Sequence, residues 1–143
     1  MTAFAFDDRH VRWKEIEGID HLALSVLDMD ETNRVSHVLF KFAAGRKILL
    51  HRHLTMNKTM TLRGEHRIYE PDGRLKEIRP AGRFTVAPPS DEPHREGGGA
   101  EGAIVLFAIH GDGALYEALD DRLNVLRTLC AQDFARLFDR EGN

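Results

Sequence analysis

Short segments of alternating apolar and polar residues, separated by turns, run through most of this chain. Residues 21–29 and 34–42 are the clearest examples, because apolar side chains occupy every second position, as in half-buried β-strands. Turn residues interrupt the pattern about every 8 to 12 residues, a spacing typical of sandwiches and barrels. The sequence therefore predicts an all-β fold, with the jelly roll among the main options. Further strands are predicted at residues 46–53, 58–64, 65–70, 74–78, 83–89, 103–110, 114–119 and 123–129.

Two segments near the C-terminal half depart from simple alternation. Residues 131–140 space Phe134, Leu137 and Phe138 as one face of a short helix. The glycine-rich residues 96–102 predict a loop that leads into residues 103–110, whose unbroken apolar run suits a strand buried on both faces or at a subunit interface. We expect the whole chain, residues 1–143, to form a single domain.

The composition excludes two classes of partner. Hydrophobic residues make up 42% of the chain and charged residues 30%, with a formal net charge of -3. Neither a nucleic-acid-binding nor a membrane-binding surface is indicated. No apolar run approaches the roughly 18 residues of a membrane helix, and the N-terminal residues lack the features of a signal peptide. A cytoplasmic protein is expected, and the lone Cys130 has no partner for an internal disulfide.

A histidine pair on one predicted strand suggests a metal site. His51 and His53 lie in the predicted strand 46–53, where residues two apart point to the same face, so both imidazoles can reach one ion. The pair alone is weak evidence in a chain with eight histidines. The residues around it carry more information.

The sequence around this pair resembles the cupin family. The first cupin motif is a glycine, five residues, HxH, three or four residues, usually a glutamate, six residues and a glycine. GRKILLHRHLTMNKTMTLRG, residues 45–64, matches every spacing, with Asn57 at the glutamate position. The second motif, a glycine, five residues, PxG, two residues and a histidine, is approximated by GRFTVAPPSDEPH, residues 82–94. It lacks the second glycine and carries one inserted residue.

This resemblance implies a double-stranded β-helix, the jelly-roll barrel of cupins, with a short C-terminal α-helix. It also implies one divalent metal ion in the barrel mouth, bound by His51, His53 and His94. Because Asn57 replaces the glutamate, three neutral imidazoles are expected to leave the full metal charge for an anionic chelating ligand. Arg95 and Glu96, after His94, are interpreted as part of a mobile rim loop outside the site.

Three-histidine cupins of this kind include the dioxygenases that cleave acetylacetone and 2,4'-dihydroxyacetophenone. The resemblance implies Fe(II) as the metal, with Zn, Ni or Mn as alternatives. It also implies cleavage of a carbon–carbon bond of a small β-diketone or hydroxyketone by dioxygen. Asn57 and Glu70 are the candidate catalytic residues that tune or orient bound groups, Glu70 as a base or occasional fourth ligand. His66 is interpreted as a surface or hydrogen-bonded residue rather than a ligand.

Two other functions remain open. Similar cupin domains occur as zinc-binding sensor halves of anti-sigma factors and as ligand-binding modules, and fold alone does not separate these from enzymes. The absence of the helical sigma-binding region of such regulators favours an enzyme. A metal-dependent isomerase or lyase would need a proton shuttle, for which Glu70, His66 or Lys58 could serve. The apolar residues 103–110 and the apolar C-terminal helix predict a homodimer, as is common for cupins.

Overall fold

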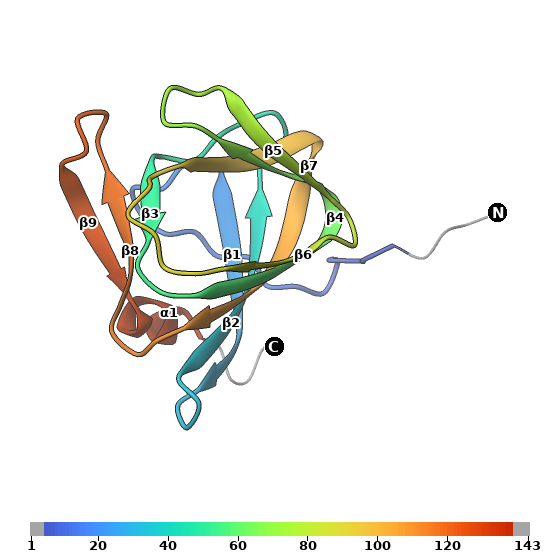
Figure 1. The fold of residues 1–143 in the computed structure, drawn as a ribbon. Helices are drawn as coiled ribbons and strands as arrows, with labels where there is room; N and C mark the ends of the chain where they lie inside the picture. The colour runs from blue at the N-terminus through green and yellow to red at the C-terminus, as the bar shows by residue number, and fades with distance from the viewer. Residues whose placement is uncertain (1–4, 139–143) are drawn as a thin grey trace.

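Two β-sheets form a barrel in the computed structural model, which describes residues 5–138 (Figure 1). The larger sheet has the strand order β1-β2-β7-β4-β5, with β6 also paired to β4, and the smaller has the order β3-β8-β9. The all-β prediction and the barrel are confirmed. The elements are β1 (Leu22–Asp30), β2 (Val35–Phe42), β3 (His51–His53), β4 (Asn57–Tyr69), β5 (Leu75–Pro80), β6 (Phe84–Ala87), β7 (Arg95–His110), β8 (Ala114–Leu119), β9 (Val125–Cys130) and α1 (Ala131–Leu137).

Alternation of side chains places the core inside this barrel. Leu24 and Val26 of β1 and Val38 of β2 are at most 1% exposed, as expected where every second residue of a strand points inward. Phe40 packs edge to face against Phe107 of β7, with ring centroids 4.8 Å apart. The apolar interior therefore holds together strands that lie far apart in the sequence.

Strand β4 is one continuous strand where the sequence predicted two. Register shifts follow Thr61 and Gly64, and bulges of this kind change which face successive side chains occupy. Asn57, Thr59 and Thr61 point inward before the shifts, and His66 points inward after them. The pairing with β7 therefore sets which side chains of β4 face the interior.

A close backbone contact explains the bulge at Gly64. Gly64 has φ +72, and a Cβ there would lie 2.1 Å from the carbonyl oxygen of Gly102. Only glycine fits such a position without moving the neighbouring strand. The glycine that ends the first motif therefore has a structural role in joining β4 to β7.

The glycine-rich loop predicted at residues 96–102 is wrong, because these residues belong to β7. A Cβ at Gly97 would lie 2.1 Å from the carbonyl oxygen of Arg46, so the glycines let β7 pass close to the segment before β3. Strand β7 lies between β2 and β4 and is not an edge strand. Its apolar run is explained by this central position, so it no longer supports the predicted homodimer, which itself stays a prediction.

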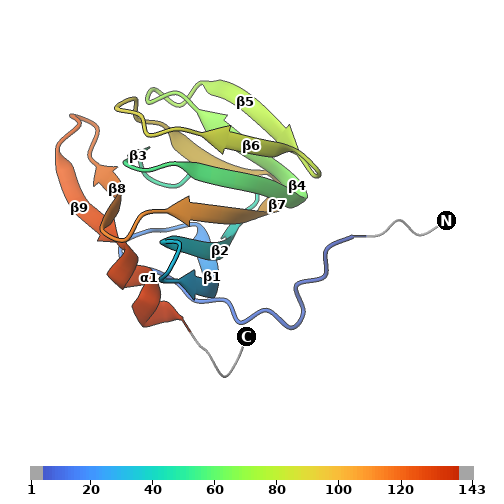
Figure 2. The same cartoon turned by 60° about the horizontal axis from the view of Figure 1, so that its bottom comes forward.

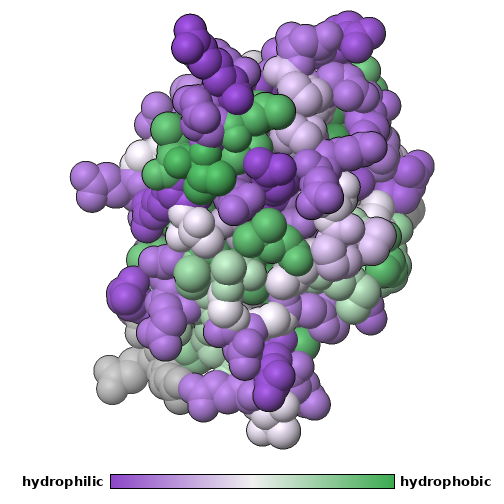
Figure 3. All heavy atoms as spheres, turned by 60° about the vertical axis from the view of Figure 1, so that its left-hand side comes forward, coloured by the Kyte–Doolittle hydropathy of each residue, from purple (hydrophilic) through white to green (hydrophobic). Residues whose placement is uncertain are grey.

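The β8–β9 hairpin and α1 stand beside the larger sheet (Figures 1 and 2). Phe134 of α1 is 1% exposed, and its ring lies 6.2 Å from that of Phe40. The predicted helix is confirmed through Leu137, whereas residues 139–140 of the prediction lie outside the described residues. The face on the side of this hairpin carries separate apolar patches among hydrophilic residues (Figure 3).

No helix within residues 5–138 is both long and apolar enough to cross a membrane. The predicted domain of residues 1–143 extends beyond the described residues at both ends, and it stays a prediction, as does the cytoplasmic location.

Candidate metal centre

Four side chains converge inside one end of the barrel. His51, His53, His94 and Glu96 each offer one ligand atom, and these atoms lie within 4.8 Å of one another. The Oε2 atom of Glu96 is 2.6 Å from Nε2 of His51, 3.2 Å from Nε2 of His53 and 3.1 Å from Nε2 of His94. The structure thus brings the three histidines named from the sequence together and adds a carboxylate that the sequence prediction left out.

Backbone pairing joins the two motif segments. His51 and His53 point to the same face of β3, which pairs with β8 opposite Ala118 and Tyr116. The amide of His51 donates to the carbonyl of His94 at 3.0 Å, and the amide of His94 donates back at 2.9 Å. This isolated bridge sets the third histidine beside the first two. The degenerate second motif therefore still places His94 in the cluster.

The rim-loop interpretation of Arg95 and Glu96 is wrong. Both residues begin β7, and Glu96 is only 3% exposed. His94 and Glu96 are two apart, so they follow the same geometric rule as His51 and His53. The group of possible ligands consequently contains three imidazoles and one carboxylate, where the sequence predicted three neutral imidazoles. The His-x-Glu spacing was the signal that could have revealed it.

The second carboxylate oxygen of Glu96 is held by His66. Nε2 of His66 lies 2.7 Å from Oε1 of Glu96, and it must donate, because an ionised carboxylate only accepts. His66 is fully buried, and its ring stacks on Phe42 with centroids 4.9 Å apart. Of the two interpretations of His66, surface or hydrogen-bonded, the second is correct.

The hydrogen bond of His51 leaves its Nε2 available as a ligand. Nδ1 of His51 lies 2.9 Å from the carbonyl oxygen of Leu49, and this nitrogen donates because a carbonyl only accepts. In neutral His51 the lone pair of Nε2 then faces the carboxylate of Glu96. Nε2 of His51 and Oε2 of Glu96 are then two hydrogen-bond acceptors only 2.6 Å apart, and they need a positive charge between them. A proton or a divalent metal ion supplies that charge, so the donor set fits a metal.

Burial and hydrogen bonding put these groups in the protonation states that a metal requires. Burial raises the pKa of the Glu96 carboxyl, but its hydrogen-bonding contacts with His51, His53, His66 and His94 outweigh burial, so the pKa lies well below its usual value. Burial lowers the pKa of His53 to about 4. At neutral pH Glu96 is therefore an anion and His53 a neutral imidazole, which are the forms that coordinate metals.

Asn57 supports the cluster indirectly. It is fully buried, its side-chain oxygen accepts a hydrogen bond from the hydroxyl of Tyr116, and its amide donates to the carbonyl of Thr55 at 3.0 Å. The ring of Tyr116 stands edge-on to His53, with centroids 5.0 Å apart. Burial first, and then the charge of Glu96, raise the pKa of Tyr116 well above its usual value. Tyr116 belongs to neither motif, and sequence reasoning missed it.

Glu70 lies apart from the gathered ligand atoms. It follows the last residue of β4, in a turn where its amide donates to the carbonyl of Arg74 at 2.8 Å and its carbonyl accepts from Gly73 at 2.9 Å. Within the described chain, the ligand group contains Glu96 and not Glu70. A role for Glu70 as a base remains a prediction.

A small cavity reaches the cluster from inside the barrel. Its volume is about 50 Å³, and His51, Glu96 and Tyr116 contribute to its wall. The remaining lining is apolar and includes Phe107 and Phe134. This cavity can hold an apolar group against the ligand atoms.

A larger cavity reaches other members of the cluster. Its volume is about 260 Å³, and His53 and His94 line it together with the charged residues Lys76, Glu77 and Arg79 of β5. His94 is the most exposed member of the cluster, with 23% of its side chain accessible. Solvent and polar molecules therefore approach the site from this side.

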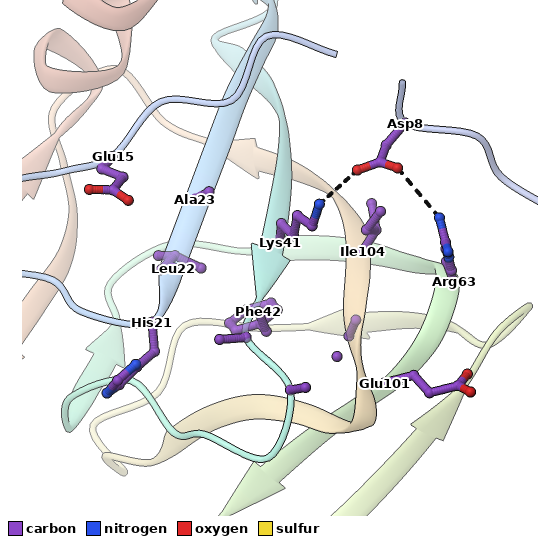
Figure 4. Close-up of a pocket in the computed structure, with 14 residues that line it drawn as sticks. Asp8, Glu15, His21, Leu22, Ala23, Lys41, Phe42, Arg63, Glu101 and Ile104 are labelled. Carbon is purple, nitrogen blue, oxygen red and sulfur yellow. Dashed lines mark hydrogen bonds and ion pairs between the residues drawn. The ribbon is translucent and has the colours of Figure 1, made fainter. Parts of the chain in front are cut away.

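A third cavity, of about 490 Å³, shares no lining residue with the cluster (Figure 4). Asp8 bridges Lys41 at 2.8 Å and Arg63 at 3.4 Å there. Trp13 also donates to Asp8 at 3.1 Å. These contacts anchor the N-terminal segment to the outside of β2 and β4. The carboxylate of Asp8 is thereby paired with the two cations that line this cavity.

Comparisons with known proteins agree with this architecture. The sequence matches no protein-family model and no curated protein. An RmlC-like cupin protein from Ralstonia eutropha JMP134 is 17% identical, with a TM-score of 0.73 over 96% of this chain and 85% of that one.

Two further solved structures show the same likeness. An acetylacetone dioxygenase from Acinetobacter johnsonii is 12% identical, with a TM-score of 0.69 over 96% of this chain and 90% of the other. A candidate acetylacetone dioxygenase from Methylibium petroleiphilum PM1 is 11% identical, with a TM-score of 0.71 over 95% and 94%. With its two sheets and its cluster of three histidines and a glutamate, the chain has the double-stranded β-helix fold of the cupins.

Proposed function

We propose that this chain is a metal-dependent dioxygenase that cleaves a carbon–carbon bond of a small β-diketone or hydroxyketone. The observation that carries the proposal is the convergence of three buried or half-buried imidazoles and one buried carboxylate on a single point. His51, His53, His94 and Glu96 would bind one divalent ion. Fe(II) is the proposed metal, and Zn, Ni and Mn also accept nitrogen and oxygen ligands.

The ligand set favours an anionic chelating substrate. One carboxylate offsets one of the two charges of a divalent ion, so the centre keeps a net positive charge. A bound metal ion would polarise the oxygens of a diketone and bring it together with dioxygen. Four protein ligands leave open positions at an ion that accepts six. An enolate with two oxygens could occupy them.

The proposed reaction needs no further reductant. When a β-diketone is cleaved, one carbon–carbon bond breaks and both atoms of dioxygen enter the products, a carboxylic acid and a 1,2-dicarbonyl compound. Removal of the proton between the two carbonyls requires a base, and Glu70 is the residue predicted for that role. Asn57 acts through Tyr116, which holds the ring of His53 in place.

Metal content and oxygen uptake test this proposal together. The purified protein is loaded with Fe(II), and uptake of oxygen is followed with β-diketones and hydroxyacetophenones. His51→Ala and His94→Ala are expected to abolish stoichiometric metal binding and oxygen uptake. His10→Ala, at an exposed histidine outside the cluster, is the matched control.

Other outcomes identify the other functions. Tightly held zinc with no oxygen uptake for any substrate would refute the dioxygenase and favour a non-catalytic binding module. Conversion of substrate without oxygen uptake would favour an isomerase or lyase. Full metal content in His51→Ala or His94→Ala would refute the proposed ligand set.

A further inference from the structure

The lining and the volume of the cavity inside the barrel distinguish between the substrate classes that the proposed function leaves open. It touches the cluster at His51 and Glu96, and apart from these residues and Tyr116 its lining is entirely apolar. The hydroxyl of Tyr116 is used by Asn57. The cavity therefore offers an apolar surface next to the ligand atoms, which suits a hydrocarbon group.

The volume of the cavity limits the size of that group. It measures about 50 Å³, and one probe-sized atom group needs roughly 10 to 15 Å³. This is the space of about four such groups, whereas an apolar cavity that binds benzene measures about 150 Å³. An aliphatic end of a substrate can enter this space, and an aryl end cannot.

The walls of the cavity are well packed. Phe40 contacts Phe107 and Phe134 edge to face, with centroids 4.8 Å and 6.2 Å apart, and Phe107 and Phe134 are at most 2% exposed. Close-packed aromatic side chains resist displacement. These aromatic walls of the cavity are therefore expected to keep their positions when a ligand binds.

The polar part of the substrate has a different place. The cavity of about 260 Å³ on the side of His53 and His94 is lined by charged residues, including Lys76 and Arg79. A molecule bound at the cluster can thus extend its polar end toward this cavity while its apolar end lies inside the barrel. The two environments give the bound substrate one orientation.

We propose that the inner cavity binds a short aliphatic group of about four carbons or fewer, so that the centre selects aliphatic β-diketone anions over aryl ketones. This inference rests on the proposed function, because it takes the cluster to be the metal site. Ala118 and Phe134 determine the length of the group. Ala118 lies opposite His51 in the pairing of β3 with β8 and lines the cavity.

Binding of alkyl hydroxamates to the zinc-loaded protein tests the inference without turnover. These compounds chelate metals through two oxygens, as an enolate would. Titration calorimetry from acetohydroxamate to octanohydroxamate is expected to show a fall in Kd of about fourfold per added methylene up to pentanohydroxamate. The gain then stops, and benzohydroxamate binds more weakly than butanohydroxamate.

Two variants and a matched control locate the effect. Ala118→Leu fills the cavity and is expected to remove the dependence on chain length while zinc content persists. Phe134→Leu enlarges the cavity and is expected to extend the gain to hexanohydroxamate. Ala108→Leu makes the same change at a residue that lines neither cavity, and it is expected to keep the wild-type series.

The results separate this inference from the proposed function. Failure of the wild-type protein to bind zinc would refute the metal centre itself. Zinc binding with equal affinity along the series, or an unchanged series in both Ala118→Leu and Phe134→Leu, would overturn the inner cavity as the aliphatic site while leaving the metal centre intact.

Discussion

Nε2 of His66 lies 2.7 Å from Oε1 of Glu96, the carboxylate oxygen that does not contact the three clustered histidines. The other oxygen, Oε2, lies within 3.2 Å of Nε2 of His51, His53 and His94. The carboxylate of Glu96 therefore contacts two groups of side chains. His66 donates to one oxygen, and the three clustered histidines surround the other oxygen, where a metal ion would bind. Donation of this kind orients a metal ligand and fixes its charge.

Loss of the carboxylate is expected to weaken metal binding strongly. Glu96→Gln keeps the shape of the side chain but removes its charge, and we predict zinc affinity at least tenfold lower, measured by competition with a chelator. Glu70→Gln, the same change outside the cluster, is expected to keep the affinity of the wild-type protein. Equal affinities for Glu96→Gln and the wild type would remove Glu96 from the ligand set.

Loss of the supporting histidine is expected to weaken metal binding as well. His66→Phe keeps an aromatic ring against Phe42 but removes the donor to Glu96. We predict zinc affinity reduced by about 10- to 100-fold and a free energy of unfolding lower by about 1 to 3 kcal/mol. Chelator competition and thermal unfolding of the metal-free protein measure the two effects. His66→Phe that unfolds earlier but binds zinc normally would show that His66 serves only the fold.

The sequence predicted the barrel because alternation of apolar and polar side chains directly indicates β-strands. It failed where backbone contacts override local pattern, as at Gly97, where the glycine run permits a close approach to Arg46 and is not a loop. The same error hid Glu96, since a residue assigned to a loop has no predictable direction. Tyr116 could not be found either, because its place beside His53 follows from the pairing of β8 with β3 and from no local spacing.

The bond between Tyr116 and Asn57 is expected to contribute to stability. Tyr116→Phe leaves the buried side-chain oxygen of Asn57 without its donor, and we predict a loss of about 1 to 3 kcal/mol in the free energy of unfolding. Pairing this change with Asn57→Leu removes both polar partners, so the double variant is expected to lose less than the sum of the two single variants. Chemical denaturation of all four proteins measures the coupling, and additive losses would show that the two groups do not interact.

Acid is expected to destabilise the metal-free protein through His53. Burial lowers the pKa of His53 to about 4 from 6.5, so between these values the unfolded chain binds the proton and the folded protein does not. Stability is therefore lost as the pH falls from about 6.5 toward 4, by up to about 3 kcal/mol. The lowered pKa of Glu96 acts in the same direction at still lower pH, because the unfolded chain takes up that proton first. Denaturation of chelator-treated protein at pH 7.0, 5.5 and 4.5 measures the loss, and His53→Asn should flatten the profile. A wild-type stability that stays constant or rises across this range would contradict the burial of a neutral His53.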